Sequence, residues 1–262
     1  MARDKLHSLS SYHISRSVSP SLLRYVLKME IPTYKPEDLE TFHKLFRAYR
    51  SHDGFGNWFR GQSNVNWPLL PKAGRKEFYL PESRDLGRFH DWCIHAVAYC
   101  TLPKSKIESL AVAQHHGLAT RLLDWTMNPL VAAYFCCIEN KETDGSIFVL
   151  ETPEQLANDD LNFELLKEHN GTIGYIPKFI SPRMLNQRAL FTIHCDAKSE
   201  IPITESVLKN GKPNLTRIVI EAKLKRELIK MLDDYGINQV VLFPDLDGLS
   251  HHMNHKTELI KK

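Results

Sequence analysis

Apolar residues recur every three or four positions in several segments of the chain. Over 36–51 this spacing predicts an amphipathic helix, and Glu37 and Asp38 supply acidic residues in its first turn. The segment 130–138 is apolar nearly all round and follows Asn128-Pro129, a good helix start, so we predict a deeply buried helix there. Other helices are expected over 84–99, 106–116 and 223–235, and after a turn at 244–248.

Short apolar runs between turn residues predict the strands. They cover 58–62, 118–125, 145–150, 189–194, 218–222 and 240–243. Strands and helices alternate irregularly instead of forming regular βαβ units, so we predict an α+β fold. We expect residues 31–262 to form a single domain, preceded by a polar arm over 1–30.

The composition is that of an ordinary globular protein. The 262 residues are 42% hydrophobic and 25% charged, and the formal net charge is only +3. Basic side chains are enriched around 178–188 and 223–230, and each group is either a solvated face or a phosphate-binding patch. The charge balance by itself does not identify a nucleic-acid-binding protein.

Cysteine usage and hydropathy indicate the compartment. The five cysteines form no CxxC pair, and Cys136 and Cys137 lie in an apolar segment, as buried free thiols of a reducing compartment do. No apolar run approaches the roughly 20 residues of a membrane helix, and the first 20 residues lack the apolar stretch of a secretory signal. We expect a cytoplasmic protein with no membrane partner.

Several common catalytic motifs are missing from the sequence. It contains no GxxxxGK[ST], GxGxxG, GxSxG or HExxH, which argues against P-loop NTPases, Rossmann dehydrogenases, α/β-hydrolases and common zinc proteases. His251 and His255 lie one helical turn apart, but no acidic or cysteine ligand accompanies them. We predict no metal site.

The first candidate motif is Trp58-Phe59-Arg60-Gly61-Gln62. An arginine among buried aromatic neighbours needs an anionic partner, because an unpaired buried guanidinium is costly. Its planar fork suits a carboxylate or a phosphate, and Gly61 lets a backbone or a ligand approach closely. The alternative is a structural ion pair.

The second candidate is the block from His116 to Phe135. Polar residues interrupt an apolar stretch just before the predicted buried helix, and so many polar groups at a buried junction must satisfy one another or a ligand. An ion pair between Arg121 and Asp124 that supports the fold is the alternative.

Together these motifs resemble the FRG domain family, whose members carry Phe-Arg-Gly and a His-Gly-x-x-Thr-Arg-Leu-Leu-Asp-Trp-Thr block. Weaker matches follow in order at Arg183-x-x-x-Gln187 and over 236–248, so the resemblance spans about 55–250. It implies an ADP-ribosyltransferase-like fold, with a split, mixed or antiparallel β core surrounded by helices. The expected activity is NAD+-dependent ADP-ribosyltransfer.

The resemblance also implies roles for individual residues. Arg60 would clamp the NAD+ pyrophosphate or its ribose, His116 and Thr126 would hydrogen-bond the nicotinamide ribose, and Trp125 would wall the nicotinamide. The expected catalytic residues are Arg60, His116 and Gln187. The expected cofactor-binding residues are Arg60, Gly61, Gln62, His116, Thr120, Arg121, Asp124, Trp125 and Thr126.

One departure from the transferase pattern concerns the late catalytic glutamate. Gln187 occupies the expected region, and Arg188 to Leu190 supply no carboxylate after it. Gln239 is a second candidate for this position, and Asp124 is a candidate source of the missing carboxylate.

The acceptor is expected to be nucleic acid, with RNA or single-stranded DNA favoured. The loop over 57–75 mixes Trp58 and Trp67 with Lys72 and Arg75, a combination that suits unpaired bases. A toxin or antiviral effector restrained by an inhibitory partner protein is a setting that fits such an enzyme. The alternatives are a non-catalytic nucleotide- or nucleic-acid-binding module and, with less support, a nuclease.

Overall fold

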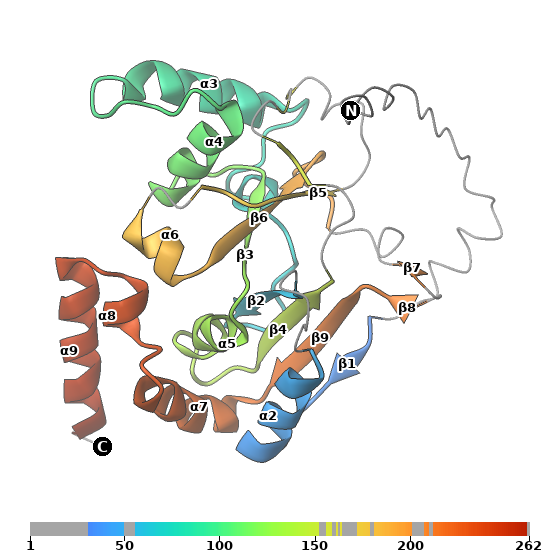
Figure 1. Ribbon diagram of the computed structural model, residues 1–262, viewed down its shortest axis with the longest axis vertical. Helices are drawn as coiled ribbons and strands as arrows, with labels where there is room; N and C mark the ends of the chain where they lie inside the picture. Colours follow the sequence, from blue (N-terminus) through green and yellow to red (C-terminus); the bar gives the residue numbers. More distant parts are fainter. Residues whose placement is uncertain are drawn as a thin grey trace, which may run out of the picture. The chain divides into compact units, whose positions relative to one another are not determined.

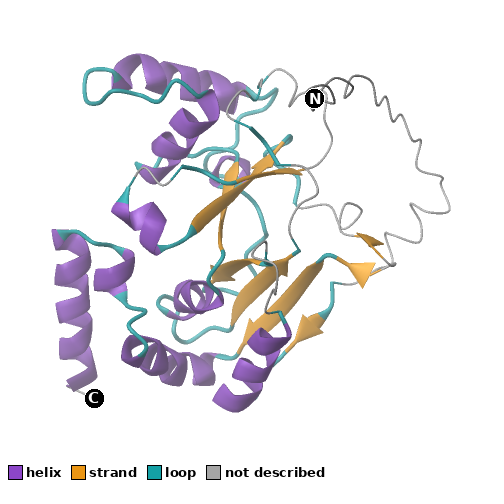
Figure 2. Ribbon diagram, viewed as in Figure 1, coloured by secondary structure: helices purple, strands orange, loops and turns teal. Residues whose placement is uncertain are grey.

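The computed structural model describes residues 31–49, 56–151, 156–158, 161, 163, 172–178, 181–200, 207–209 and 212–260. Within these ranges the chain forms a seven-stranded mixed sheet and eight α-helices (Figures 1 and 2), which confirms the α+β prediction. Residues 31–262 cluster as one compact unit. The polar arm predicted over 1–30 lies outside the described residues.

The sheet is antiparallel except at one edge. Its strands lie in the order β1 (Thr33–Tyr34), β9 (Leu215–Ile220), β4 (Gly145–Leu150), β2 (Trp58–Gln62), β3 (Leu122–Thr126), β6 (Ala189–His194) and β5 (Thr172–Tyr175). Among the described strands of this sheet, β1 and β9 are the one pair that runs parallel. A separate short pair is formed by β7 (Val207–Lys209) and β8 (Lys212–Pro213).

The sheet is weakly joined at its centre. Strand β2 pairs with β4 along its whole length, and β3 pairs with β6 in the same way. Between β2 and β3, however, only Phe59 and Thr126 form a register pair. The two halves of the sheet therefore open away from each other beyond this pair, and the candidate site lies at this opening.

Each half of the sheet has its own helices and apolar core. Helices α2 (Leu39–Ala48), α5 (Pro129–Cys137) and α7 (Ala222–Asp234) share a core with β2, β4 and β9. Helices α3 (Arg84–Ala96) and α4 (Lys106–His115) share a second core with β3, β5 and β6. A third cluster contains Trp58, Trp125 and Phe148 and joins strands of both halves.

Local signals account for most helix starts. Asp38 and Thr41 form a reciprocal capping box ahead of α2. The side chain of Asn128 accepts a hydrogen bond from the Leu130 N–H, and Pro129 occupies the first turn of α5, as predicted. Six of the nine residues of α5 are buried, so the prediction of a deeply buried helix is confirmed.

The strand predicted over 240–243 is wrong. Residues 240–242 belong to α8 (Gln239–Leu242), a short helix that ends before its C-cap Phe243 and that Asn238 caps by accepting from the Val241 N–H. The β-branched residues of this short apolar run favour a strand, but the asparagine cap before it favours a helix, and the run is helical. The sequence also did not predict β1, β5 or the five-residue helix α6 (Pro182–Asn186). The terminal helix was expected and is α9 (Leu246–Ile260).

Candidate functional site

A cavity of about 1580 Å³ opens where β2 and β3 separate. Its walls come from both halves of the sheet and from helices α4, α5, α6, α7, α8 and α9. The predicted site residues that line it are Arg60, Gly61, Gln62, Asp124, Trp125, Thr126 and Gln187. The cavity therefore unites the Phe-Arg-Gly strand with the second half of the 116–135 block and with the late Gln187.

Arg60 spans the opening between the two strands. Its Nη1 donates to the Asp124 carbonyl oxygen at 2.8 Å and lies 3.7 Å from Oδ2 of the same residue. Its Nε is buried without a hydrogen-bond partner. Burial lowers the pKa of the Arg60 guanidinium, Asp124 opposes this shift and Arg75 adds to it. A desolvated guanidinium with an unused donor is suited to an anionic ligand.

Asp124 is the carboxylate that faces Arg60. It is exposed in the middle of a strand whose other residues are buried. The Gln114 side-chain amide donates to its Oδ1 at 2.7 Å, and the Thr120 hydroxyl in turn donates to the Gln114 carbonyl oxygen. Gln114 therefore orients the carboxylate, a role that the sequence gave no reason to predict.

The other cavity residues of β3 are engaged with the protein. The Trp125 indole N–H donates to the Thr192 hydroxyl at 3.0 Å. The Thr126 hydroxyl donates to the Gln187 carbonyl oxygen at 2.7 Å, and the Gln187 amide donates to the Leu242 carbonyl oxygen at 3.0 Å. These contacts fix the cavity wall and leave little freedom for Thr126 to bind a ribose hydroxyl.

Gly61 and Gln62 differ in what they offer to a ligand. A Cβ on Gly61 would lie 1.9 Å from the Ala132 carbonyl oxygen and 2.6 Å from the Cys136 nitrogen, so the close approach at this glycine is with helix α5. Gln62 donates to the Pro68 carbonyl oxygen, while its buried Oε1 has no partner. Gln62 therefore offers an acceptor at the cavity wall.

The structure separates His116, Thr120 and Arg121 from the cavity lining. His116 ends α4 and is exposed, whereas its neighbour His115 lines the cavity. Burial lowers the pKa of His115, and the charge of Arg183 lowers it further. The sequence pointed to His116, whereas the helical phase at the end of α4 turns His115 to the cavity.

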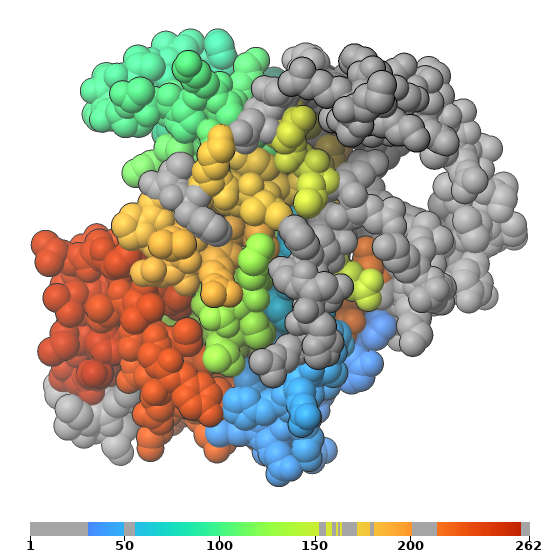
Figure 3. Space-filling view, viewed as in Figure 1, coloured from blue at the N-terminus to red at the C-terminus, as the bar shows by residue number. Residues whose placement is uncertain are grey.

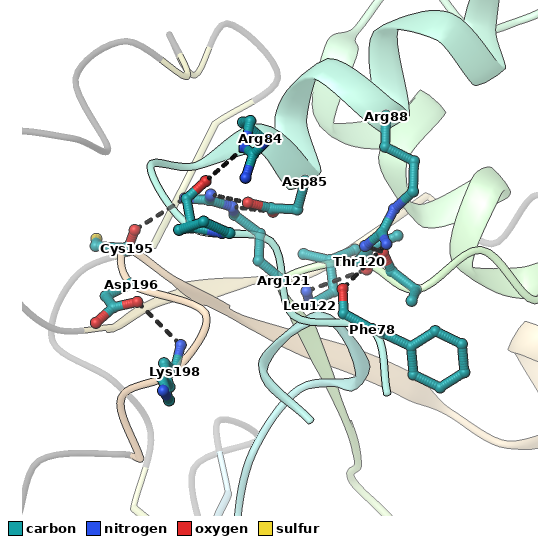
Figure 4. Close-up of polar contacts among 12 residues, drawn as sticks. Phe78, Arg84, Asp85, Arg88, Thr120, Arg121, Leu122, Cys195, Asp196 and Lys198 are labelled. Atoms are coloured by element: carbon teal, nitrogen blue, oxygen red, sulfur yellow. Dashed lines mark hydrogen bonds and ion pairs between the residues drawn. The ribbon is translucent and has the colours of Figure 1, made fainter. Parts of the chain in front are cut away.

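Arg121 is part of a buried ion pair (Figure 4). Its Nε and Nη2 donate to both carboxylate oxygens of Asp85, at 2.9 and 2.7 Å, and its Nη1 donates to the Cys195 carbonyl oxygen. The side chain is 1% exposed. The partner of Arg121 is thus Asp85 and not Asp124, and its geometry is structural. Thr120 is likewise buried, and its hydroxyl donates to the Gln114 side-chain oxygen and accepts from the Leu122 N–H.

Only part of the loop over 57–75, which was expected to contact nucleic acid, is exposed. Trp58 is 1% exposed and belongs to the core, so it cannot stack on a base. Trp67 is 42% exposed and lines the cavity with Lys72 and Arg75. The Lys72 Nζ also lies 5.0 Å from the ring centroid of Phe78, and the Phe78 side chain is 38% exposed.

The described residues offer neither a cluster of metal ligands nor a membrane-spanning helix. They contain no group of three or more His, Cys, Asp or Glu side chains placed to hold a metal ion. His251 and His255 instead line the cavity from α9. None of the helices described is both long and apolar enough to span a membrane.

The fold and the cavity define an α+β protein with an arginine-bearing cleft in an opened mixed sheet. Residues 56–145 match the family model of the FRG domain. This segment contains Phe59-Arg60-Gly61 and the block from His116 to Phe135, so the match supports the resemblance to the FRG family. Comparisons with curated proteins and with solved structures gave no match.

Proposed function

We propose that this protein is an NAD+-dependent ADP-ribosyltransferase whose active site is the cavity between β2 and β3. The observation that carries the proposal is Arg60, a largely buried guanidinium with an unpartnered Nε at the wall of a cavity of about 1580 Å³. Such a group suits the pyrophosphate of a dinucleotide, because burial strengthens its attraction to an anion. Lys72, Arg75 and Arg183 add positive charge to the cavity wall.

The proposed reaction exchanges one bond to the nicotinamide ribose. The C1′–N bond to nicotinamide breaks, and its electron pair leaves with the neutral base. A nucleophilic group of the acceptor forms the new bond to C1′ and gives up its proton. Positive charge develops on the sugar during this exchange, so a carboxylate near C1′ stabilises the transition state.

Asp124 is the carboxylate that we assign to this task. It lies beside Arg60, which would hold the pyrophosphate, and Gln114 orients it. His115 also lines the cavity, and its lowered pKa keeps it neutral near pH 7, so it is suited to accept the acceptor proton. Gln187 has no charge to contribute, and its amide is held by the Leu242 carbonyl.

We propose a single-stranded nucleic acid as the acceptor, with RNA favoured. Trp67 and Phe78 are exposed aromatics beside Lys72 and Arg75, and this mixture binds unpaired bases by stacking and phosphates by charge. The acceptor strand would then enter the cavity from the loop that contains Trp67.

A non-catalytic nucleotide-binding module is the second candidate. It is favoured by the engagement of Asp124, whose Oδ1 accepts from Gln114 and whose Oδ2 lies 3.7 Å from Arg60. In a module of this kind Asp124 would only position the arginine. Binding of NAD+ without turnover would identify it.

The test incubates the protein with NAD+ labelled in the adenylate moiety and with cellular RNA, single-stranded DNA and protein in separate reactions. Transfer of label to RNA, a mass gain of one ADP-ribose unit and loss of both in Arg60→Ala are expected. Arg47→Ala, on the exposed face of α2, is the matched control and should transfer normally. Tight NAD+ binding with neither transfer nor hydrolysis would refute the enzyme.

A further inference from the structure

Two sequence motifs outside the arginine site pack directly on each other. The Asn186 amide donates to the Val241 carbonyl oxygen at 2.7 Å, and the Gln187 amide donates to the Leu242 carbonyl oxygen at 3.0 Å. These bonds fasten the end of α6 to α8, and Figure 3 shows the gold and red segments meeting at the surface. The segments Arg183–Gln187 and Leu242–Gly248 therefore form one structural unit.

This unit places a cation on an aromatic ring inside the cavity. The Arg183 guanidinium carbon lies 4.4 Å from the centroid of the Phe243 ring. Phe135 of α5 meets the same ring edge-on, at 6.1 Å between centroids and 78° between planes. All three side chains are partly buried and line the cavity. We call Arg183, Phe243 and Phe135 the platform.

The backbone around Phe243 fixes the position of its ring. A Cβ on Gly248 would lie 1.9 Å from the Phe243 carbonyl oxygen and 2.8 Å from its Cβ, so only glycine fits there. The Asp245 carboxylate accepts from the Gly248 N–H at 2.7 Å and holds the start of α9. The platform is thus preorganised by the turn that the FRG resemblance singled out.

The guanidinium of Arg183 has N–H donors that could bind a ligand. For the described residues, no hydrogen bond or ion pair of its guanidinium is found, and it rests on the Phe243 ring. Burial lowers the pKa of Arg183, and the charges of Asp124 and Asp245 oppose this shift. The joint between α6 and α8 is already made by two amide side chains, so holding the helices together does not require the arginine. A guanidinium on an aromatic ring keeps its N–H edge for phosphate and its outer face for a flat base.

The geometry points to a nucleotide-binding subsite at the platform, with the base stacked on the outer face of Arg183 and the phosphate held by the Arg183 N–H groups. This inference deepens the proposed function and rests on it only for the source of the nucleotide. Two sources share this chemistry, namely the adenosine end of NAD+ and one nucleotide of an acceptor strand. Both present a flat base next to a phosphate.

The test measures binding of AMP, of ribose 5-phosphate and of a single-stranded RNA tetranucleotide to the full chain by titration calorimetry. The wild type should bind at least one of the two base-bearing ligands about fivefold or more tightly than ribose 5-phosphate, as expected for a stacked base. Arg183→Lys and Phe243→Leu should each remove most of this preference, since lysine has no plane and leucine has no ring. Leu185→Ala, 55% exposed on the same helix, is the matched control and should bind normally.

The ligands also separate the two sources. Competition between AMP and NAD+ assigns the platform to the adenosine end, whereas Arg183-dependent binding of the tetranucleotide without AMP binding assigns it to the acceptor. No preference for a base in the wild type, or a preference unchanged in folded Arg183→Lys and Phe243→Leu proteins, would overturn the subsite. AMP binding at the platform together with complete absence of NAD+ turnover would uphold the subsite and reject the transferase.

Discussion

At the scale of single residues, the proposed activity depends on the planar guanidinium of Arg60, which can form two parallel hydrogen bonds to a phosphate. Arg60→Lys keeps the charge but loses the planar fork, so we expect the rate of NAD+ consumption to fall by about 100-fold. The measurement is the rate of nicotinamide release at saturating NAD+, with unfolding followed in parallel. Arg47→Lys is the control, and a folded Arg60→Lys protein with a near-normal rate would contradict the clamp role.

Arg121 leads to a different expectation, because its partner Asp85 is buried at 4% exposure. Arg121→Ala leaves that carboxylate unpaired in the core, which should lower the free energy of unfolding by about 3–5 kcal/mol. Urea denaturation of both proteins measures the loss. Arg84→Ala, one residue from Asp85 but exposed, should change stability by less than about 0.5 kcal/mol. A stable Arg121→Ala protein that binds NAD+ poorly would restore Arg121 to the cofactor site.

At the scale of elements, Gly61 shows why strand β2 and helix α5 lie so close together. A Cβ at this position would penetrate the α5 backbone, at 1.9 Å from the Ala132 carbonyl oxygen. Gly61→Ala should therefore force β2 and α5 apart and cost about 3 kcal/mol or more of stability. The readout is the thermal unfolding midpoint.

Gly87 provides the matched control for this prediction. It lies inside α3, and a Cβ there would meet nothing within 4 Å. Gly87→Ala should raise stability by about 0.5–1 kcal/mol, because alanine is the better helix former. Equal effects of the two substitutions would show that backbone entropy, and not the β2–α5 contact, governs Gly61.

The helices and strands that were predicted correctly have one property in common. Strands β2, β4 and β6 and helices α5 and α7 have local signals that agree with their burial, such as the Asn128-Pro129 start of α5. Helix α8 was misjudged because its cap outweighs its strand-like composition, and β1 is two residues long. Periodicity cannot detect elements of that length.

At the scale of the whole molecule, the sequence motifs predict several residues of the cavity wall but not which side chains pair with one another. Arg60 and Asp124 do share a cavity. The pairing of Arg121 with Asp85 joins positions far apart in the chain, and the choice of His115 over His116 depends on a helical phase of one residue. The ion pair and the orientation of the histidines both depend on tertiary packing, which the pattern of a single sequence does not reveal. Phe135, expected to be a core residue, proved to be partly exposed at the cavity.

The global stability of the fold should depend on pH through His194. This residue is fully buried in β6, where Nδ1 lies 2.8 Å from the Ser199 carbonyl oxygen and Nε2 lies 3.4 Å from the Thr192 hydroxyl. Burial lowers the pKa of His194 to about 4, the Ser199 carbonyl opposes this shift, and the charges of Arg60 and Arg121 add to it. The folded protein therefore holds this histidine neutral at pH 7.

Because the unfolded chain binds the His194 proton near pH 6.5 and the folded chain only near pH 4, acid favours the unfolded state between these values. The contribution of His194 to stability is complete above about pH 6.5 and is lost progressively as the pH falls toward 4, by about 3 kcal/mol in total. Urea unfolding at pH 7, 6 and 5 measures this slope. His194→Asn keeps a donor for the Ser199 carbonyl but cannot titrate, so its stability should fall less steeply over the same range. An unchanged slope in that variant would assign the acid sensitivity to other groups.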